Sequence, residues 1–584
     1  MIVNILSFVI ISYMNALTKI LKKWQTYVII ALIVLATLAG FWNISVDGRV
    51  HSHGFCGNRA FEHVYAIAQE PRRFFDLESL EFTREYIMGQ LDSFNVENFI
   101  VEHTPASGID VKNIYARIPG TSGVYILLMA HYDTHPSSNS LGVGDNAYAV
   151  ATLLEIARIF SVKANESPLV NGIKFVFTDA EEIGLHGAIR LVNEREMVTE
   201  HNANWILDNV NLVVNIEGRG IRGPLFLFET SDNNRRIINF FARSGRPFGF
   251  SFASEIYSIL PMRTELGIFL EAGFNGINLS VLDSVEYYHT DLDNLDNICM
   301  DALQNYGNTL MPLLIEYTAS SRYSRMDSFD SSSDSVFFTI LPNIFIRYNN
   351  IFSWIIIILL LIGTIVLFIL KKVNLKKTLI AFGFWFGFIL ISAGIGFLVS
   401  IVLGLASGVP FSIAGIMSFV AFDRGALVLT SLLICILAFI AVIIKRKTLK
   451  LETKHMLWSG IFINLLFLLI TAFALHGATF LFLWITILAI GSIAIRHIKH
   501  ENIGKYISIG FIILLLLFGI SLGVTITYSL FVGMTISVLF IILALSAVAL
   551  TIMVPILYEL VRELNSIVNA NITYCSGDIL SPEP

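Results

Sequence analysis

Residues 125–145, YILLMAHYDTHPSSNSLGVGD, contain the pattern that decides the fold of this chain. The first six residues are an unbroken apolar run of the length expected for a buried strand, and the run stops at His131, with Asp133 two residues later. A glycine-containing loop then leads to Asp145, a favourable N-cap residue for the apolar-periodic helix expected over residues 147–160. We therefore expect one imidazole and one or two carboxylates at the carboxyl edge of a sheet, where open α/β folds bind ligands.

Three further apolar runs end in the same way as the first. Each is followed by a histidine or by glutamates: residues 173–177 precede Glu181 and Glu182, residues 212–216 precede Glu217, and residues 277–282 precede His289. Strand-like and helix-like segments alternate from residue 124 to residue 317, which predicts a three-layer α/β/α sandwich with a mostly parallel sheet. A set of His, Asp and Glu side chains suits zinc and is too large for one tetrahedral ion, whereas two ions that share a carboxylate would use all five.

The order of these motifs, HxD, GxGD, DAEEIG, IEG and YHT, resembles the co-catalytic zinc aminopeptidase and glutamate carboxypeptidase superfamily, peptidase clan MH. The resemblance covers roughly residues 58–320. It implies two Zn²⁺ ions per chain. One ion would be held by His131 and Glu217, the other by Glu182 and His289, and Asp145 would bridge the two.

The same resemblance implies roles for three more residues. Glu181 matches the general base that acts on the attacking water. Asp133 would orient His131 without binding the ion itself. Tyr288 matches a tyrosine that helps to stabilise the tetrahedral oxyanion in some relatives, although a packed aromatic residue is the alternative interpretation.

The chain also departs from the pattern of many soluble members. They have Asp where this chain has Glu217, and a Ser-Asp-His triplet where it has Thr264, Glu265 and Leu266. Glu at this position is similar to the membrane-bound branch, of the endoplasmic reticulum metallopeptidase and vacuolar membrane protease type. That branch implies a membrane domain after the peptidase.

Composition independently indicates a membrane protein with a soluble part. Of the 584 residues, 55% are hydrophobic and 14% are charged, whereas a soluble globular chain carries about 25% charged residues. A net charge of -6 gives no reason to expect a nucleic-acid partner. The expected domains are a cytoplasmic segment (1–26), a transmembrane signal anchor (27–43), a zinc metallopeptidase domain (44–319), a polar linker (320–350), a polytopic domain of about seven or eight helices (351–557) and a tail (558–584).

The basic residues predict the orientation of the chain in the membrane. Seven apolar spans are expected at about 352–370, 379–405, 426–444, 457–475, 478–495, 506–528 and 530–557, and residues 407–422 could add another or re-enter the membrane. Lysine and arginine cluster before the anchor and then in every second loop between these spans. The catalytic domain is therefore expected on the non-cytoplasmic side, periplasmic or lumenal, and we favour a bacterial inner membrane because no organelle signal is evident.

These features predict a membrane-anchored dizinc metallopeptidase, most simply an aminopeptidase, with a peptide substrate and membrane lipid as partners. Two alternatives stay open: a catalytically silent, peptide-binding ectodomain, and a glutaminyl cyclase or carboxypeptidase that uses the same site. Nearby polar residues are candidates for a substrate pocket or are solvated loop residues, namely His135, Arg263 and Glu265, whereas His186 is expected to face the next helix. Cys56 and Cys299 could form a disulfide in an oxidising compartment.

Overall fold

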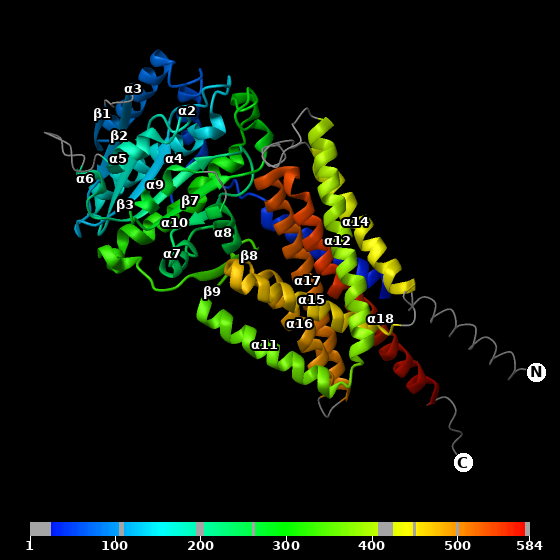
Figure 1. The fold of residues 1–584 in the computed structure, drawn as a ribbon. Helices are drawn as coiled ribbons and strands as arrows, with labels where there is room; N and C mark the ends of the chain where they lie inside the picture. Colours follow the sequence, from blue (N-terminus) through cyan, green and yellow to red (C-terminus); the bar gives the residue numbers. More distant parts are fainter. Residues whose placement is uncertain are drawn as a thin grey trace, which may run out of the picture.

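The computed structural model describes residues 25–103, 110–193, 204–259, 263–406, 424–447, 451–497 and 501–577. Within these ranges the chain forms an α/β domain joined to a bundle of long apolar helices (Figure 1). The expected cytoplasmic segment before residue 25, the additional span at 407–422 and the tail after residue 577 lie outside the described residues.

The α/β domain is built on one mixed sheet of seven strands in the order β1-β2-β4-β3-β5-β7-β6. The strands are β1 (Glu97–His103), β2 (Val111–Ile118), β3 (Tyr125–His131), β4 (Gly172–Thr178), β5 (Val210–Gly218), β6 (Phe226–Thr230) and β7 (Gly276–Val281). The central strands β4, β3, β5 and β7 run parallel, and antiparallel strands flank them on both sides. Their carboxyl ends therefore meet at one edge, as the four apolar runs predict.

Helices cover both faces of this sheet, which confirms the predicted sandwich. They are α2 (Gly57–Ile67), α3 (Leu77–Ser93), α4 (Tyr148–Glu166), α5 (His186–Asn193), α6 (Asn204–Leu207), α7 (Arg235–Phe241), α8 (Ser251–Ile259), α9 (Glu265–Glu271) and α10 (Met300–Ala319). Successive residues of β3 alternate between two buried clusters: Leu128 packs with α2, α4 and α10, and Leu127 packs with α5 and α9. Because both faces are covered, the central strands are apolar along their length rather than alternating.

The segment predicted to be a polar linker connects the two parts but is folded. It forms two 3-10 turns and then a hairpin of β8 (Ser335–Leu341) and β9 (Ile344–Asn349). Tyr323 and Phe329 are 4% and 1% exposed, and their rings stack at 5.5 Å. These aromatic side chains fold an otherwise serine-rich stretch because they bury apolar area against the domain.

The C-terminal part consists of helices that match all seven spans expected there. They are α11 (Asn350–Leu370), α12 (Leu375–Ala406), α14 (Arg424–Lys447), α15 (Thr453–Ala474), α16 (Phe480–Ala494), α17 (Glu501–Met534) and α18 (Leu539–Gly577). Six of these regions, together with the helix Gln25–Ile44, are long and apolar enough to cross a membrane, and α14 contains a shorter apolar stretch, Leu429–Val442. The lysine-bearing turn between α11 and α12 lies at the end of the bundle far from the α/β domain (Figure 1).

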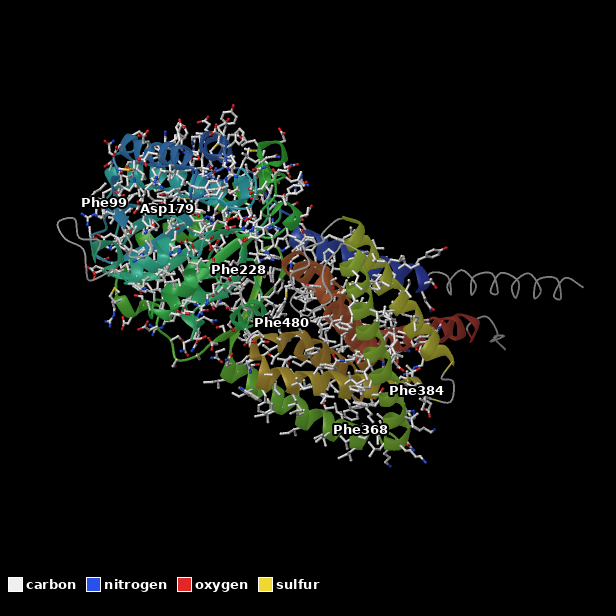
Figure 2. All side chains as sticks on the ribbon, turned by 45° about the horizontal axis from the view of Figure 1, so that its top comes forward. Phe99, Asp179, Phe228, Phe368, Phe384 and Phe480 are labelled. Atoms are coloured by element: carbon white, nitrogen blue, oxygen red, sulfur yellow. The ribbon has the colours of Figure 1, made fainter. Side chains whose placement is uncertain are left out.

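The two parts meet through specific contacts. Phe480, at the start of α16, stacks on Phe338 of β8 at 4.5 Å, and it marks the junction in Figure 2. The hydroxyl of Ser251 in α8 donates to the carbonyl of Gly477 at 2.6 Å, and the N–H of Gly477 donates to Glu255 Oε1 at 2.7 Å. The α/β domain is thus fixed against the helix ends that face it. Cys56 and Cys299, considered above as a disulfide pair, are free thiols.

Candidate active site

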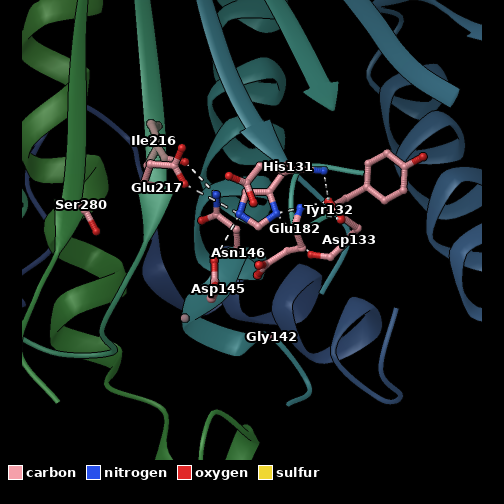
Figure 3. Close-up of polar contacts among 12 residues, drawn as sticks. His131, Tyr132, Asp133, Gly142, Asp145, Asn146, Glu182, Ile216, Glu217 and Ser280 are labelled. Carbon is pink, nitrogen blue, oxygen red and sulfur yellow. Dashed lines mark hydrogen bonds and ion pairs between the residues drawn. The ribbon is translucent and has the colours of Figure 1, made fainter. Parts of the chain in front are cut away.

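The site lies at the carboxyl ends of the parallel strands, where His131, Asp145 and Glu217 lie close together (Figure 3). Oδ1 of Asp145 is 3.2 Å from His131 Nε2, and Oδ2 is 3.2 Å from His289 Nε2. His131 ends β3, Asp145 follows the loop before α4, and His289 follows β7. One carboxylate therefore faces two imidazoles that are separated by 158 residues of chain, from 131 to 289.

Two glutamates complete the arrangement. Glu217 Oε2, at the end of β5, lies 3.9 Å from His131 Nε2, and Glu182 Oε1, after β4, lies 3.2 Å from His289 Nε2. The structure thus brings together all five residues predicted as metal ligands. They fall into two groups of one histidine and one glutamate, and each group shares Asp145.

Close backbone approach makes this geometry possible. Gly218 follows Glu217 and lies against the loop of Asp145, where a Cβ atom would come within 2.3 Å of the carbonyl oxygen of Gly144. Gly142, two residues before Gly144, has a φ of +59°, a conformation that glycine adopts without steric cost. The glycines of the GxGD and EG motifs therefore let two loops touch and place their carboxylates side by side.

The buried carboxylates of the site would be stabilised by a nearby positive charge. Burial raises the pKa of Glu182 to about 8, and the charge of Asp145 adds to this increase. Burial also opposes the charged form of His289, but the carboxylates of Asp145 and Glu182, each 3.2 Å away, raise its pKa to about 9. Burial works against ionisation of Asp145 as well, yet the two histidines beside its oxygens hold its pKa below the ordinary value. Several buried carboxylates at one place are stabilised by a bound cation.

The residues present fit a metal ion. Glu182 Oε1 and His289 Nε2 are buried and have no hydrogen-bond partner among the described residues. Ligand atoms of His135, Glu182 and His289 all lie within 4.8 Å of one another. Neutral imidazole nitrogen and carboxylate oxygen are the ligands that zinc takes in catalytic sites.

Asp133 and Glu181 lie next to these ligands. Asp133 Oδ1 is 3.4 Å from His131 Nδ1, in agreement with its expected orienting position. Its two oxygens also accept the backbone N–H groups of Glu181 and Glu182, each at 3.1 Å. The pKa of Glu181 is raised well above the ordinary value by burial, and the negative charges of Glu217 and Glu182 contribute.

Three residues that hold the ligands were not identified from the sequence. Asp293 is 2% exposed and accepts the N–H of Gly144 at 2.6 Å and the N–H of Asp145 at 3.3 Å. Arg72 is 1% exposed and donates to backbone carbonyls on both sides of the loop, at Tyr132 and Leu141, each at 2.8 Å. The third residue is Asn215, whose amide donates to Glu217 Oε1 at 2.8 Å.

The sequence carried a signal for only one of these three. Asn215 stands two residues before Glu217 on the same strand, so the strand period puts both side chains on one face. Asp293 is close to His289 in sequence, but nothing in the pattern shows that it reaches the loop of Asp145. Arg72 acts on a loop that begins 60 residues later, and no local pattern links the two.

The other side chains considered near the site divide into two groups. The rings of Tyr288 and His135 both stack on His289, with centroid distances of 3.6 Å and 3.9 Å. Glu265 is completely buried and accepts a hydrogen bond from the Thr178 hydroxyl at 2.7 Å. Arg263, by contrast, has a side chain that is 68% exposed and pairs with Glu271 at 3.5 Å.

The α/β domain is similar in sequence to known peptidases. Residues 113–314 match the model of peptidase family M28. The chain is 26% identical over 245 residues to endoplasmic reticulum metallopeptidase 1 of Rattus norvegicus, covering 41% of this chain and 26% of that protein. It is 31% identical over 196 residues to the vacuolar membrane protease of Candida dubliniensis, covering 33% of this chain and 19% of that protein.

Among solved structures, a glutaminyl cyclase from Porphyromonas gingivalis is 20% identical, with 45% of this chain and 98% of that chain covered and a TM-score of 0.35. The matched regions span 26% and 19% of the length of the two membrane peptidases. Residues 113–314 are therefore similar to peptidase family M28, and the membrane peptidases that the chain matches are of the branch that its motifs indicated.

Proposed function

We propose that this chain is a membrane-anchored dizinc peptidase that removes residues from the amino terminus of peptides on the non-cytoplasmic side. The observation that carries the proposal is the placement of Asp145, with one oxygen facing each histidine. A single tetrahedral ion would need no such shared carboxylate, whereas two adjacent ions would. His131 and Glu217 would hold one ion with Asp145, and His289 and Glu182 would hold the other.

The chemistry proposed for the site is peptide-bond hydrolysis. Bound zinc ions would supply Lewis-acid activation of a water molecule and of the scissile carbonyl. Glu181, a carboxylate whose pKa is raised by burial, would accept a proton from the water as its oxygen bonds to the carbonyl carbon. As the C–N bond breaks, Glu181 would return that proton to the leaving amine. The hydroxyl of Tyr288, whose ring stacks on His289, would donate to the developing oxyanion.

The charge of the site supports cleavage at the amino rather than the carboxyl terminus. Two divalent ions bring four positive charges, whereas six carboxylates lie around the site, on Asp133, Asp145, Glu181, Glu182, Glu217 and Glu265. With the guanidinium of Arg219, which lies 5.6 Å from the ring of Tyr288, full ionisation would leave an excess of one negative charge. Such a field favours a protonated α-amine and disfavours a free α-carboxylate.

The proposal is tested on the full-length chain in detergent or nanodiscs. We expect about two zinc ions per chain and hydrolysis of aminoacyl substrates in preference to N-blocked peptides. Glu181→Gln is expected to lower kcat roughly a hundred- to ten-thousand-fold and to retain the metal, because it removes the base and no ligand. Glu85→Gln, an exposed glutamate on α3, is the matched control and should leave activity unchanged.

Other outcomes separate the alternatives. Two zinc ions with cleavage of N-terminal glutaminyl substrates to cyclic products would replace the peptidase by a cyclase. Two zinc ions with no turnover in the panel would contradict the proposed catalysis and favour a peptide-binding ectodomain. The absence of stoichiometric metal would overturn the dizinc proposal itself.

A further inference from the structure

The two histidines of the candidate metal site are held in different ways. Nδ1 of His131 lies 3.2 Å from the carbonyl oxygen of Asp133 and 3.4 Å from Asp133 Oδ1. A ligand histidine is usually oriented by such a contact of its second nitrogen. No such partner is found for the second nitrogen of His289, Nδ1, within the described part of the chain. The torsion that sets the plane of a histidine ring is broad, so a ring without a hydrogen bond needs another constraint.

Stacking supplies this constraint at His289. The ring of Tyr288 lies 3.6 Å from it at an interplanar angle of 23°, and the ring of His135 lies 3.9 Å from it at 20°. Two rings this close and this nearly parallel to a third cannot share one face, because they would overlap. His289 is therefore enclosed between Tyr288 and His135.

The chain fixes His135 in this position from both sides. The preceding residue, Thr134, exchanges two hydrogen bonds with buried Arg72, at 2.8 Å and 3.0 Å. On the following side, the N–H of Ser137 donates to His135 Nδ1 at 3.3 Å. The main chain before His135 is thus held by the backbone of a fully buried arginine, and its ring accepts a hydrogen bond from its own loop, so that neither constraint comes from the proposed metal ligands.

We infer that His135 is a positioning residue of the second metal site, which fixes the ring of His289 by stacking so that Nε2 points to Asp145 and Glu182. The inference rests on the proposed dizinc function and names a residue that acts on a ligand rather than on the ion. In the present geometry the flat face of His135, and not a ring edge, is turned toward His289. The face is therefore the part of the side chain that matters.

Replacement of His135 shows whether the flat face of its ring or one of its nitrogen atoms is needed at the second metal site. His135→Leu keeps much of the volume without a flat ring, His135→Ala removes both, and His135→Phe keeps a ring that has no nitrogen. The full-length chain is stripped of metal and titrated with zinc against a chromophoric chelator. Loss of outer contacts to a metal ligand typically costs 10- to 100-fold in metal affinity. We expect His135→Leu and His135→Ala to weaken one of two zinc affinities by about this factor and to leave the other unchanged.

His135→Phe is expected to restore the weakened affinity to within about threefold of the wild type, because an aromatic face is present again. The d–d absorption of Co²⁺ bound at the weaker site should change in the Leu variant and recover in the Phe variant. His186→Ala, at the start of α5, is the matched control, since this histidine follows the glutamates in sequence and does not stack on a ligand in the described structure. Unfolding of the metal-free variants shows whether each one is folded.

Two results would overturn the inference. Unchanged zinc affinities in both His135→Leu and His135→Ala would show that stacking does not position His289. An equal loss of zinc affinity in His135→Phe and His135→Ala would show that a nitrogen atom of His135 binds the ion. This residue would then be a ligand. If the wild type itself fails to bind two zinc ions, the proposed function fails first, and this outcome is visible before any variant is compared.

Discussion

At the scale of single residues, the carboxylate of Asp293 fixes the position of Asp145, the proposed bridging ligand. It accepts the N–H groups of Gly144 and Asp145 and the hydroxyl of Ser140, at 2.6, 3.3 and 3.1 Å. Asp293→Asn replaces one acceptor oxygen by an NH₂ group. This group is itself a donor and would face the N–H or hydroxyl groups that now donate to Asp293. Because Asp145 would serve both ions under the proposed function, we expect both zinc affinities to fall, roughly 10- to 100-fold.

The zinc titration described above measures this effect. Asp291→Asn is the control, since Asp291 lies two residues earlier in the same loop and is exposed. Wild-type affinity at both sites in Asp293→Asn would show that the loop of Asp145 keeps its place without this carboxylate.

At the scale of elements, the contact between α2 and α3 makes the domain sensitive to acid. His63 in α2 is 7% exposed, and its Nδ1 lies 2.8 Å from the hydroxyl of Tyr86 in α3. Burial lowers the pKa of His63 from 6.5 to about 4, so the folded domain holds the neutral imidazole. Stability from this group is fully present above pH 6.5 and is lost as the pH falls through 4, by up to roughly 3 kcal/mol.

Hydrogen exchange of the α2 amides between pH 7 and pH 4 checks this prediction once intrinsic exchange rates are corrected for. His63→Phe keeps an aromatic ring against Tyr86 and Phe94 and should show a smaller loss of protection at low pH. His51→Phe, at a side chain that is 46% exposed, should behave like the wild type. Equal acid sensitivity in wild type and His63→Phe would contradict the assignment.

The hairpin of β8 and β9 shows how an element can be missed. The serine-rich start of the segment indicated a linker, although the residues that follow are apolar on either side of Pro342 and Asn343. Asn343 has a φ of +65°, which a tight turn requires and which asparagine tolerates. A hairpin signal was therefore present and was outweighed by the composition of the preceding residues.

At the scale of the whole molecule, the helix bundle contacts a loop of the candidate active site. Tyr528, Ser529 and Val532 of α17 face Leu282 and Asp283, which lie between β7 and His289. The bundle thus supports the loop that carries a proposed ligand. The other junction includes two hydrogen bonds: the Ser251 hydroxyl donates to the carbonyl of Gly477, and the N–H of Gly477 donates to Glu255.

The double variant Ser251→Ala, Glu255→Ala tests how tightly this junction is closed. Each buried hydrogen bond contributes about 1 kcal/mol, so we expect the loss of both to speed local exchange roughly 30-fold. Hydrogen exchange of peptides from α8 and from the turn between α15 and α16 reports it. Ser258→Ala, in the same helix, removes an exposed bond and serves as control. Unchanged exchange would mean that the aromatic stack of Phe338 and Phe480 holds the two parts without these bonds.

The sequence by itself determined the fold class, the seven C-terminal helices and the side chains that come together at the site. These properties are local: the length of an apolar run predicts a strand or a membrane span, and a residue directly after a strand must lie at the edge of the sheet. His131, Asp145, Glu181, Glu182, Glu217 and His289 became candidates because each follows such a run or its loop, and the resemblance to peptidase clan MH selected the five ligands among them.

Only the tertiary structure decided how these side chains are held. Asp293 reaches a loop about 150 residues earlier, Arg72 reaches one that begins 60 residues later, and His135 lies on a ring 154 residues away, from 135 to 289. Such contacts have no period and no fixed spacing, because they depend on which loops the sheet order brings together. The sequence pattern shows which side chains stand at the end of each strand. The orientation of these side chains depends on neighbouring residues that come into contact only after folding.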